Sequence, residues 1–131
     1  MKTTKLIAAV KIPMSHADYM LWRIDLVYMK NIVRVLVNTI TYIESKDEKL
    51  TVYFLDGTFI YCELTITAIL VLLPEPQFVK CHQSYIVNAK HISGYTNGDG
   101  GILLMEGNFD VPVSRQYKDV TIAAMHANVN D

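Results

Sequence analysis

From Leu26 onward the chain is a series of short β-branched and aromatic runs, and this pattern constrains the fold more than any other feature. Such residues favour the pleated surface of a sheet. Turn residues separate the runs, and Asp56-Gly57 is a strong two-residue hairpin signal because both turn positions must tolerate positive φ. We therefore expect strands over the following residues: Leu26–Lys30, Ile32–Val37, Ile40–Glu44, Leu50–Leu55, Thr58–Glu63, Phe78–His82, Ile92–Thr96, Ile102–Glu106 and Phe109–Val113.

Short helices interrupt this β pattern. From Thr65, which can cap a helix start, to Pro74, which ends it, the apolar residues follow a helical period. Ser84 can cap a short helical turn toward Asn88, and Ser114 can cap a final helix. The inward residues expected in that helix are Tyr117, Val120, Ala124 and Met125. The sequence thus predicts a mainly β, mostly antiparallel domain with short helices.

The composition does not indicate one class of binding partner. At 131 residues, of which 51% are hydrophobic, it is long enough to bury a core as one domain. The net charge of -1 gives no attraction of the whole chain to nucleic acid or to acidic membranes. Lys and Arg outnumber Asp and Glu by eight to five up to Lys49, and beyond it acids outnumber bases by eight to four. Any electropositive surface must be local.

Residues 1–24 read as an N-terminal extension, and residues 25–131 as the β domain. Pro13 interrupts the extension, and residues 15–18 could cap a short helix through Leu21 and Trp22. The apolar run after Lys5 is too short for a signal peptide, and Ile66–Leu73 is far short of the roughly 20 residues that span a membrane. We expect a soluble, cytoplasmic protein.

The two cysteines, Cys62 and Cys81, fit a reducing compartment. Buried thiols are the default reading, although the pair could form a redox switch if their strands were neighbours. Cys81 and His82 should face opposite sides of a strand, so they are poorly placed as a catalytic dyad. The histidines and cysteines show no metal-ligand spacing. We expect no enzyme activity, no metal and no cofactor.

Two polar elements stand out against this apolar background. Phe78–Asn88 sets Lys, His, Gln, Ser and Asn among apolar anchors, and Ser114-Arg115-Gln116-Tyr117 follows the last expected strand. Together they resemble the LytTR family, the DNA-binding output domain of many bacterial response regulators in two-component systems. The family pattern of aromatic, basic, His-x-Ser, apolar and Asn positions is met by Phe78, Lys80, His82, Ser84, Ile86, Val87 and Asn88. The family strand Ile-x-Tyr-Ile-Glu is similar to Ile40–Glu44, and the resemblance runs over about residues 25–127.

The resemblance implies an elongated β–β–β sandwich of small antiparallel sheets with short helices. It also implies DNA binding through loops in successive major grooves, without a recognition helix. Arg115, beside the cap Ser114, matches a base-reading Arg of the family and can bind a phosphate or guanine O6 and N7. Gln83 occupies a DNA-contacting position and can pair with adenine or a phosphate, or merely cap the next turn.

The cations expected to assist are weaker candidates. Lys46 and Lys49 lie in the connection that corresponds to the other DNA-facing loop of the family, but Asp47 and Glu48 stand between them. Lys80 replaces the more usual Arg, so it can neutralise a phosphate but cannot form a planar fork. Hydrogen bonding by four further residues is expected to support the site: His82, Ser84, Asn88 and Tyr117.

The leading hypothesis is a sequence-specific, double-stranded DNA-binding transcriptional regulator that pairs as a homodimer on repeated half-sites. Family members usually carry a receiver domain, which residues 1–24 cannot contain, so we expect either a stand-alone regulator or a sensor or receiver acting in trans. The alternative is a β-rich protein-interaction or regulatory module with the same fold and weak or no DNA binding. The extension could pack on the β domain, mediate pairing, or dock on a membrane or a partner.

Overall fold

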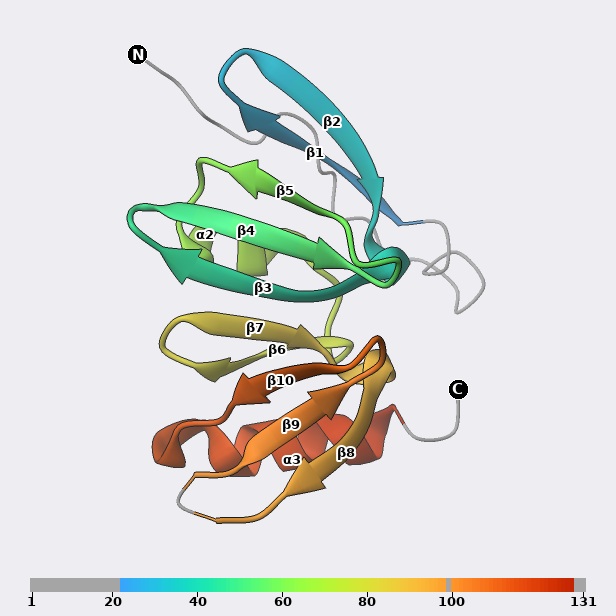
Figure 1. The fold of residues 1–131 in the computed structure, drawn as a ribbon, viewed down its shortest axis with the longest axis vertical. Helices are drawn as coiled ribbons and strands as arrows, with labels where there is room; N and C mark the ends of the chain where they lie inside the picture. Colours follow the sequence, from blue (N-terminus) through green and yellow to red (C-terminus); the bar gives the residue numbers. More distant parts are fainter. Residues whose placement is uncertain (1–21, 99, 129–131) are drawn as a thin grey trace.

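The structure, a computed structural model, describes residues 22–98 and 100–128, and Figure 1 shows three antiparallel sheets stacked along the long axis of the molecule. A hairpin of β1 (Arg23–Tyr28) and β2 (Asn31–Leu36) forms the first sheet. The central sheet has the order β5-β4-β3-β7-β6, with bounds Phe59–Cys62, Lys49–Phe54, Ile40–Lys46, Tyr85–Asn88 and Phe78–His82. The third has the order β10-β9-β8, with bounds Phe109–Pro112, Ile102–Met105 and Ile92–Thr96. The expected elongated β–β–β arrangement is confirmed.

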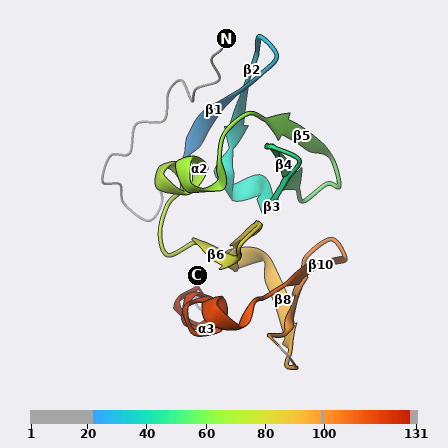
Figure 2. The ribbon, with the colours of Figure 1, turned by 90° about the vertical axis from the view of Figure 1, so that its left-hand side faces the viewer.

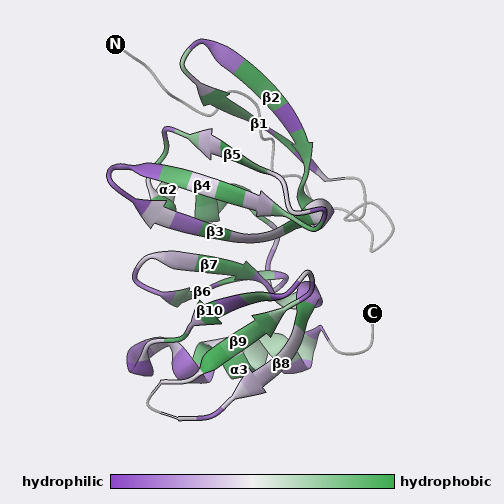
Figure 3. Cartoon of the chain, in the orientation of Figure 1, coloured by the Kyte–Doolittle hydropathy of each residue, from purple (hydrophilic) through white to green (hydrophobic). Residues whose placement is uncertain are grey.

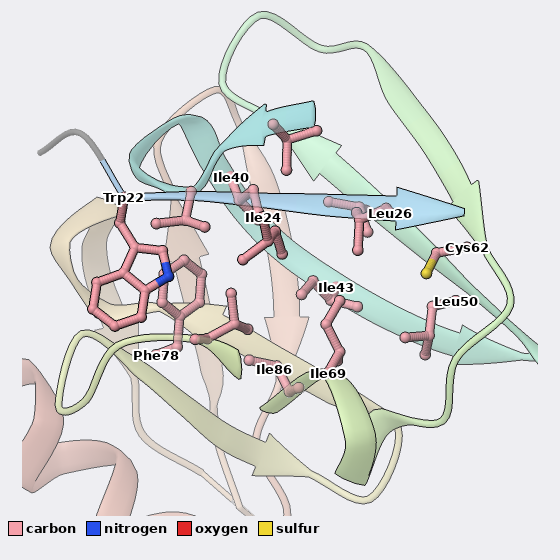
Figure 4. Packing of buried hydrophobic residues seen from close by; sticks show 14 residues of the cluster. Trp22, Ile24, Leu26, Ile40, Ile43, Leu50, Cys62, Ile69, Phe78 and Ile86 are labelled. Carbon is pink, nitrogen blue, oxygen red and sulfur yellow. The ribbon is translucent and has the colours of Figure 1, made fainter. Parts of the chain in front are cut away.

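Both faces of the central sheet pack against other elements, and the two faces receive different residues because successive side chains of a strand point to opposite sides. On one face Ile43 and Ile86 pack with residues of the β1–β2 hairpin and of helix α2 (Ile66–Leu72), as Figure 4 shows. On the other face, Val87 and Cys81 pack against the β8–β10 sheet and helix α3 (Lys118–Ala127). Two separate cores therefore hold three layers together.

The hairpin turns differ in their backbone. The β1–β2 and β3–β4 hairpins have two-residue turns in which non-glycine residues take positive φ, for example Asp47 at 53° and Glu48 at 64°. In the β4–β5 turn only Gly57 has positive φ, while the Asp56 carboxylate accepts hydrogen bonds from Thr58. The hairpin expected at Asp56-Gly57 is confirmed, but its turn is longer than two residues because Asp56 closes it through its side chain.

Helix α2 follows the sequence expectation, since the Thr65 hydroxyl accepts from the Ala68 N–H at 3.1 Å and Ile69 is buried. The expected helical turn before Asn88 is wrong, because Tyr85–Asn88 is strand β7, paired with both β6 and β3. Two-sided strand pairing outweighs the local capping preference of Ser84. The inward placement of Val120 is also wrong, since Thr121 and Ala124 are the buried residues of α3 and Val120 is 49% exposed.

At the N-terminal end, strand β1 begins earlier than expected, at Arg23. Trp22 is buried, and the Val37 N–H donates to its carbonyl oxygen at 2.9 Å. The expected cap at residues 15–18 lies outside the described residues. Short 3₁₀ turns at Val37–Thr39 and Ala89–His91 connect the layers, and Figure 2 shows α2 and α3 on the same side of the stack.

The first core gives a stability prediction. Ile43→Ala should lower the free energy of unfolding by about 2–5 kcal/mol, because Ile43 is fully buried and the truncation leaves a cavity. Ile32→Ala is the matched control, since Ile32 is 59% exposed on β2 and its loss should cost less than about 1 kcal/mol. Urea unfolding measures both, and equal costs would contradict the assignment of Ile43 to the core.

Candidate nucleic-acid interface

Three connecting segments carry most of the residues assigned to DNA by the sequence, and they lie along one edge of the molecule. They are the β3–β4 turn, the β6–β7 turn and the connection from β10 to α3, on the left in Figure 1 and toward the viewer in Figure 2. The Ser45 N–H donates to Ser84 O at 2.8 Å, and the Ser114 N–H donates to Cys81 O at 3.0 Å. These backbone bonds hold the three segments in fixed relation, and we call them together the turn edge.

Gln83 lies in the β6–β7 turn of this edge, and its side chain is exposed. Strand β6 ends at His82, so the turn and not strand alternation sets the direction of Gln83. The Ser84 N–H donates to His82 Nδ1 at 3.1 Å, which closes the turn, and the His82 ring meets the Tyr85 ring edge-on at 5.4 Å. The turn that carries the Gln83 carboxamide is therefore held in place by the packing of His82 on Tyr85.

Arg115 is exposed at the start of the connection to α3. The expected capping by Ser114 is wrong, because its side chain makes no capping bond and its hydroxyl oxygen is buried without a partner among the described residues. Arg115–Tyr117 forms a 3₁₀ turn, and the α-helix begins only at Lys118. The sequence could not separate these two helical types, since both accept the same residues. Arg115 therefore precedes the N-terminus of α3.

Gly100 fixes the strand that leads to Ser114. Its φ is +84°, and a Cβ there would collide with the carbonyl oxygen of Val113. The Tyr95 hydroxyl donates to Gly100 O at 2.8 Å, and the Val113 N–H donates to Gly101 O at 3.0 Å. The connection between β8 and β9, which contains Gly100 and Gly101, therefore positions the Arg115 turn through close backbone contact, which only glycine permits at Gly100.

The predicted cations occupy different surroundings. Lys46 and Lys49 pair across the β3–β4 hairpin, with the exposed Asp47 and Glu48 between them; this turn is coloured as hydrophilic in Figure 3. Lys49 Nζ lies over the Tyr61 ring at 4.4 Å from its centroid. Lys80 Nζ lies over the ring of the half-buried Tyr117 at 5.4 Å, next to the Arg115 turn. The edge is thus positive near Lys80 and Arg115 and mixed in charge at the β3–β4 turn.

A tyrosine–carboxylate network behind the turn edge was missed from the sequence. Glu44 accepts hydrogen bonds from the hydroxyls of Tyr85 at 2.9 Å and Tyr53 at 3.3 Å. Burial first, and then the bond to Glu44, raise the pKa of Tyr85 to about 12, so the hydroxyl stays a donor at neutral pH. The alternation of strand Ile40–Lys46, which puts Tyr42 and Glu44 on one face, is the signal that could have revealed it.

Asn88 ties β7 to the start of β3. Its side chain is buried, with Nδ2 donating to Ile40 O at 2.9 Å and Oδ1 accepting from the Lys90 N–H at 3.0 Å. Both polar ends are therefore satisfied within the protein. This geometry allows Asn88 to support the β6–β7 hairpin from the end opposite to Gln83.

The two cysteines are both buried and free, and they belong to different cores. Cys62 lies in β5 and Cys81 in β6, the two outer strands of the central sheet, so the idea of neighbouring strands is wrong. Burial raises the pKa of Cys62 to about 11 and that of Cys81 to about 12. Among the described residues no group of three His, Cys, Asp or Glu side chains could hold a metal ion, and no helix there is long and apolar enough to span a bilayer.

Comparison with known proteins identifies the class. A model described as the LytTr DNA-binding domain matches residues 30–124. The sensory transduction protein LytT of Bacillus cereus is 32% identical over 91 residues, which are 67% of this chain and 36% of that protein. The transcriptional regulatory protein YpdB of Escherichia coli O6:H1 is 30% identical over 95 residues, which are 70% of this chain and 38% of that protein.

A solved structure supports the same conclusion. The LytTr DNA-binding domain of a protein described as a methyl-accepting/DNA response regulator from Bacillus cereus superposes with a TM-score of 0.69 and 26% identity, covering 79% of this chain and 95% of that one. The chain belongs to the LytTr DNA-binding domain family, which confirms the resemblance stated from the sequence. It spans little more than a third of the length of the curated relatives that it matches.

The burial of both thiols gives a prediction. At pH 8 a disulfide reagent should leave both cysteines of the folded chain unmodified over minutes, because their raised pKa values keep them protonated and their sulfurs are covered. Two thiols per chain should react once urea unfolds the protein. A variant with Ser93→Cys, at an exposed position, provides the reactive control. Rapid labelling of Cys62 or Cys81 in the folded chain would contradict this.

Proposed function

We propose that this chain binds double-stranded DNA through the turn edge and regulates transcription as a sequence-specific factor. The observation that carries the proposal is the backbone-bonded arrangement of the three segments, which exposes Gln83 and Arg115 on one edge. The β6–β7 turn and the Arg115 turn enter one major groove, and the β3–β4 turn reaches toward the next. Membership of a family of DNA-binding domains supports this reading.

Arg115 and Gln83 are the proposed base-reading residues. A guanidinium can bind O6 and N7 of guanine with two parallel hydrogen bonds, and a carboxamide can bind N6 and N7 of adenine. Both side chains are exposed, and both are carried by turns that the backbone fixes. A fixed backbone position matters because a bidentate pair contributes about 1–3 kcal/mol of discrimination only when both of its hydrogen bonds are well aligned.

The proposed phosphate contacts are Lys80, Lys46 and Lys49. Lys80 ranks first because its surroundings are the most positive. Lys80 lies beside the Arg115 turn, whereas Asp47 and Glu48 offset the charges of Lys46 and Lys49. The buried hydroxyl of Ser114 must rotate outward to reach a phosphate, so we assign Ser114 mainly the backbone bond to Cys81. His82, Ser84, Asn88 and Tyr117 act as supports of these turns.

The cellular arrangement follows from the relatives. One relative is named as a sensory transduction protein and another as a transcriptional regulatory protein, and both are longer than the matched region. We infer that the chain works in the cytoplasm, pairs as a homodimer on repeated half-sites, and responds to a sensor or receiver protein. We assign it no catalytic role and no cofactor.

A protein-interaction module with the same fold is the second candidate. The net charge of -1 and the two acids at the β3–β4 turn favour it, because non-specific DNA binding depends on local positive charge. Electrophoretic retardation with random duplex at low salt separates the two candidates. Retardation that weakens with added salt supports DNA binding, and its absence favours the interaction module.

Arg115→Ala should weaken binding to a site selected from a random duplex library by roughly 5- to 150-fold, or about 1–3 kcal/mol, and relax the preference at one base position. Titration with fluorescently labelled duplex measures both quantities. Arg23→Ala is the matched control, because it removes the same charge from an exposed position on β1 outside the turn edge. Equal effects of the two substitutions on affinity and base preference would remove Arg115 from the base-reading role.

A further inference from the structure

An apolar groove of about 620 Å³ lies between α3, the end of α2 and strand β6. Its volume falls within the range of sites that bind ligands. The residues that line it include Leu70, Pro76, Phe78, Val79, Val120 and Ala123, and its charged lining residues are Glu75 and Lys80. Figure 2 shows the side of the molecule on which both helices lie.

The groove leaves apolar surface in water. Val120 is 49% exposed, although a helix of this kind normally turns its valines toward the core. The neighbouring Ala123 and Ala127 are also exposed and line the same groove. Contiguous apolar surface of this kind marks a place where another segment packs, because burying it is favourable by about 25 cal/mol per Å².

The described part of the chain begins beside a residue that lines this groove. Trp22, the first described residue, is 3% exposed and anchored by the Val37 N–H. Figure 4 shows its indole beside the ring of Phe78, and both belong to the same core cluster. Phe78 also lines the groove, so the described chain begins one side chain away from the groove, at Trp22.

That segment has the composition and length to cover the groove. Residues 1–21 contain two apolar runs, Leu6–Val10 and Tyr19–Leu21. The nearer run directly precedes Trp22, and a chain extends by at most about 3.3–3.6 Å per residue, so the farther run can also reach the groove. Lys11 and Asp18 provide charges opposite to those of Glu75 and Lys80.

We propose that this groove is the docking site of the chain's own N-terminal segment, residues 1–21. The groove also includes Lys80 and Tyr117, whose cation–ring contact lies next to the Arg115 turn. Docking therefore covers exposed apolar surface and borders the turn edge at the same time. The proposal goes beyond the proposed function and does not depend on DNA binding.

Disulfide trapping in the full-length chain tests this docking. Ala123→Cys is combined with Met20→Cys in one variant and with Ala8→Cys in another, and each is oxidised with copper–phenanthroline at low protein concentration. Cys62 and Cys81 are buried, so we expect them not to form disulfides under these conditions. The control pairs the same N-terminal cysteines with Ser93→Cys, which is exposed on β8.

We expect at least one Ala123→Cys variant to form an intramolecular disulfide about tenfold or more faster than its Ser93→Cys control. Adding Val120→Glu should remove that difference, whereas Val71→Glu, at an exposed position of α2 outside the groove lining, should leave it. Equal rates in all pairs would overturn the proposal. Disulfide-linked dimers in place of monomers would also overturn it and assign the groove to a second copy of the chain.

Discussion

The pairing of β7 with β3 is the interaction on which the rest of the structure depends. It sets Tyr42 opposite Val87, Ile43 opposite Ile86 and Glu44 opposite Tyr85, and so joins two hairpins that are far apart in sequence. Because the period of a strand is two residues, a slip of one residue would exchange the side chains of both cores. The same register brings the β3–β4 and β6–β7 turns to one edge, so a stability constraint also assembles the site.

A nearly neutral chain can bind DNA only if its charges are arranged locally. The turn edge meets this need unevenly, with Lys80 near Arg115 at one end and an acid-containing turn at the other. Glu44 adds a negative charge behind the edge, but two tyrosine hydroxyls donate to it and so occupy its oxygens. In the proposed complex the number of phosphates contacted by these local cations, and not the net charge of the chain, sets the salt dependence of binding.

Much of the fold could be predicted because hydrophobic period and turn residues are local signals. The strands at Phe78–His82 and Ile92–Thr96, and the cap at Thr65, required no knowledge of distant contacts. Strand β7 could not be predicted locally, because its pairing with β3 is a long-range property. The inward face of α3 is set by tertiary packing, which buries Thr121 and Ala124 and leaves Val120 exposed. To predict the Glu44 network one must know both the strand register and the order of strands in the sheet, and no single segment of the sequence contains this information.

Amide shift mapping on the ¹⁵N-labelled chain, titrated with its selected duplex, tests the central claim most directly. The account predicts that the largest changes fall on residues 46–49, 83–84 and 114–118, and that the β4–β5 turn at residues 55–58, on the opposite edge in Figure 1, stays unchanged. Large changes at residues 55–58 with little change at Gln83 and Arg115 would contradict it.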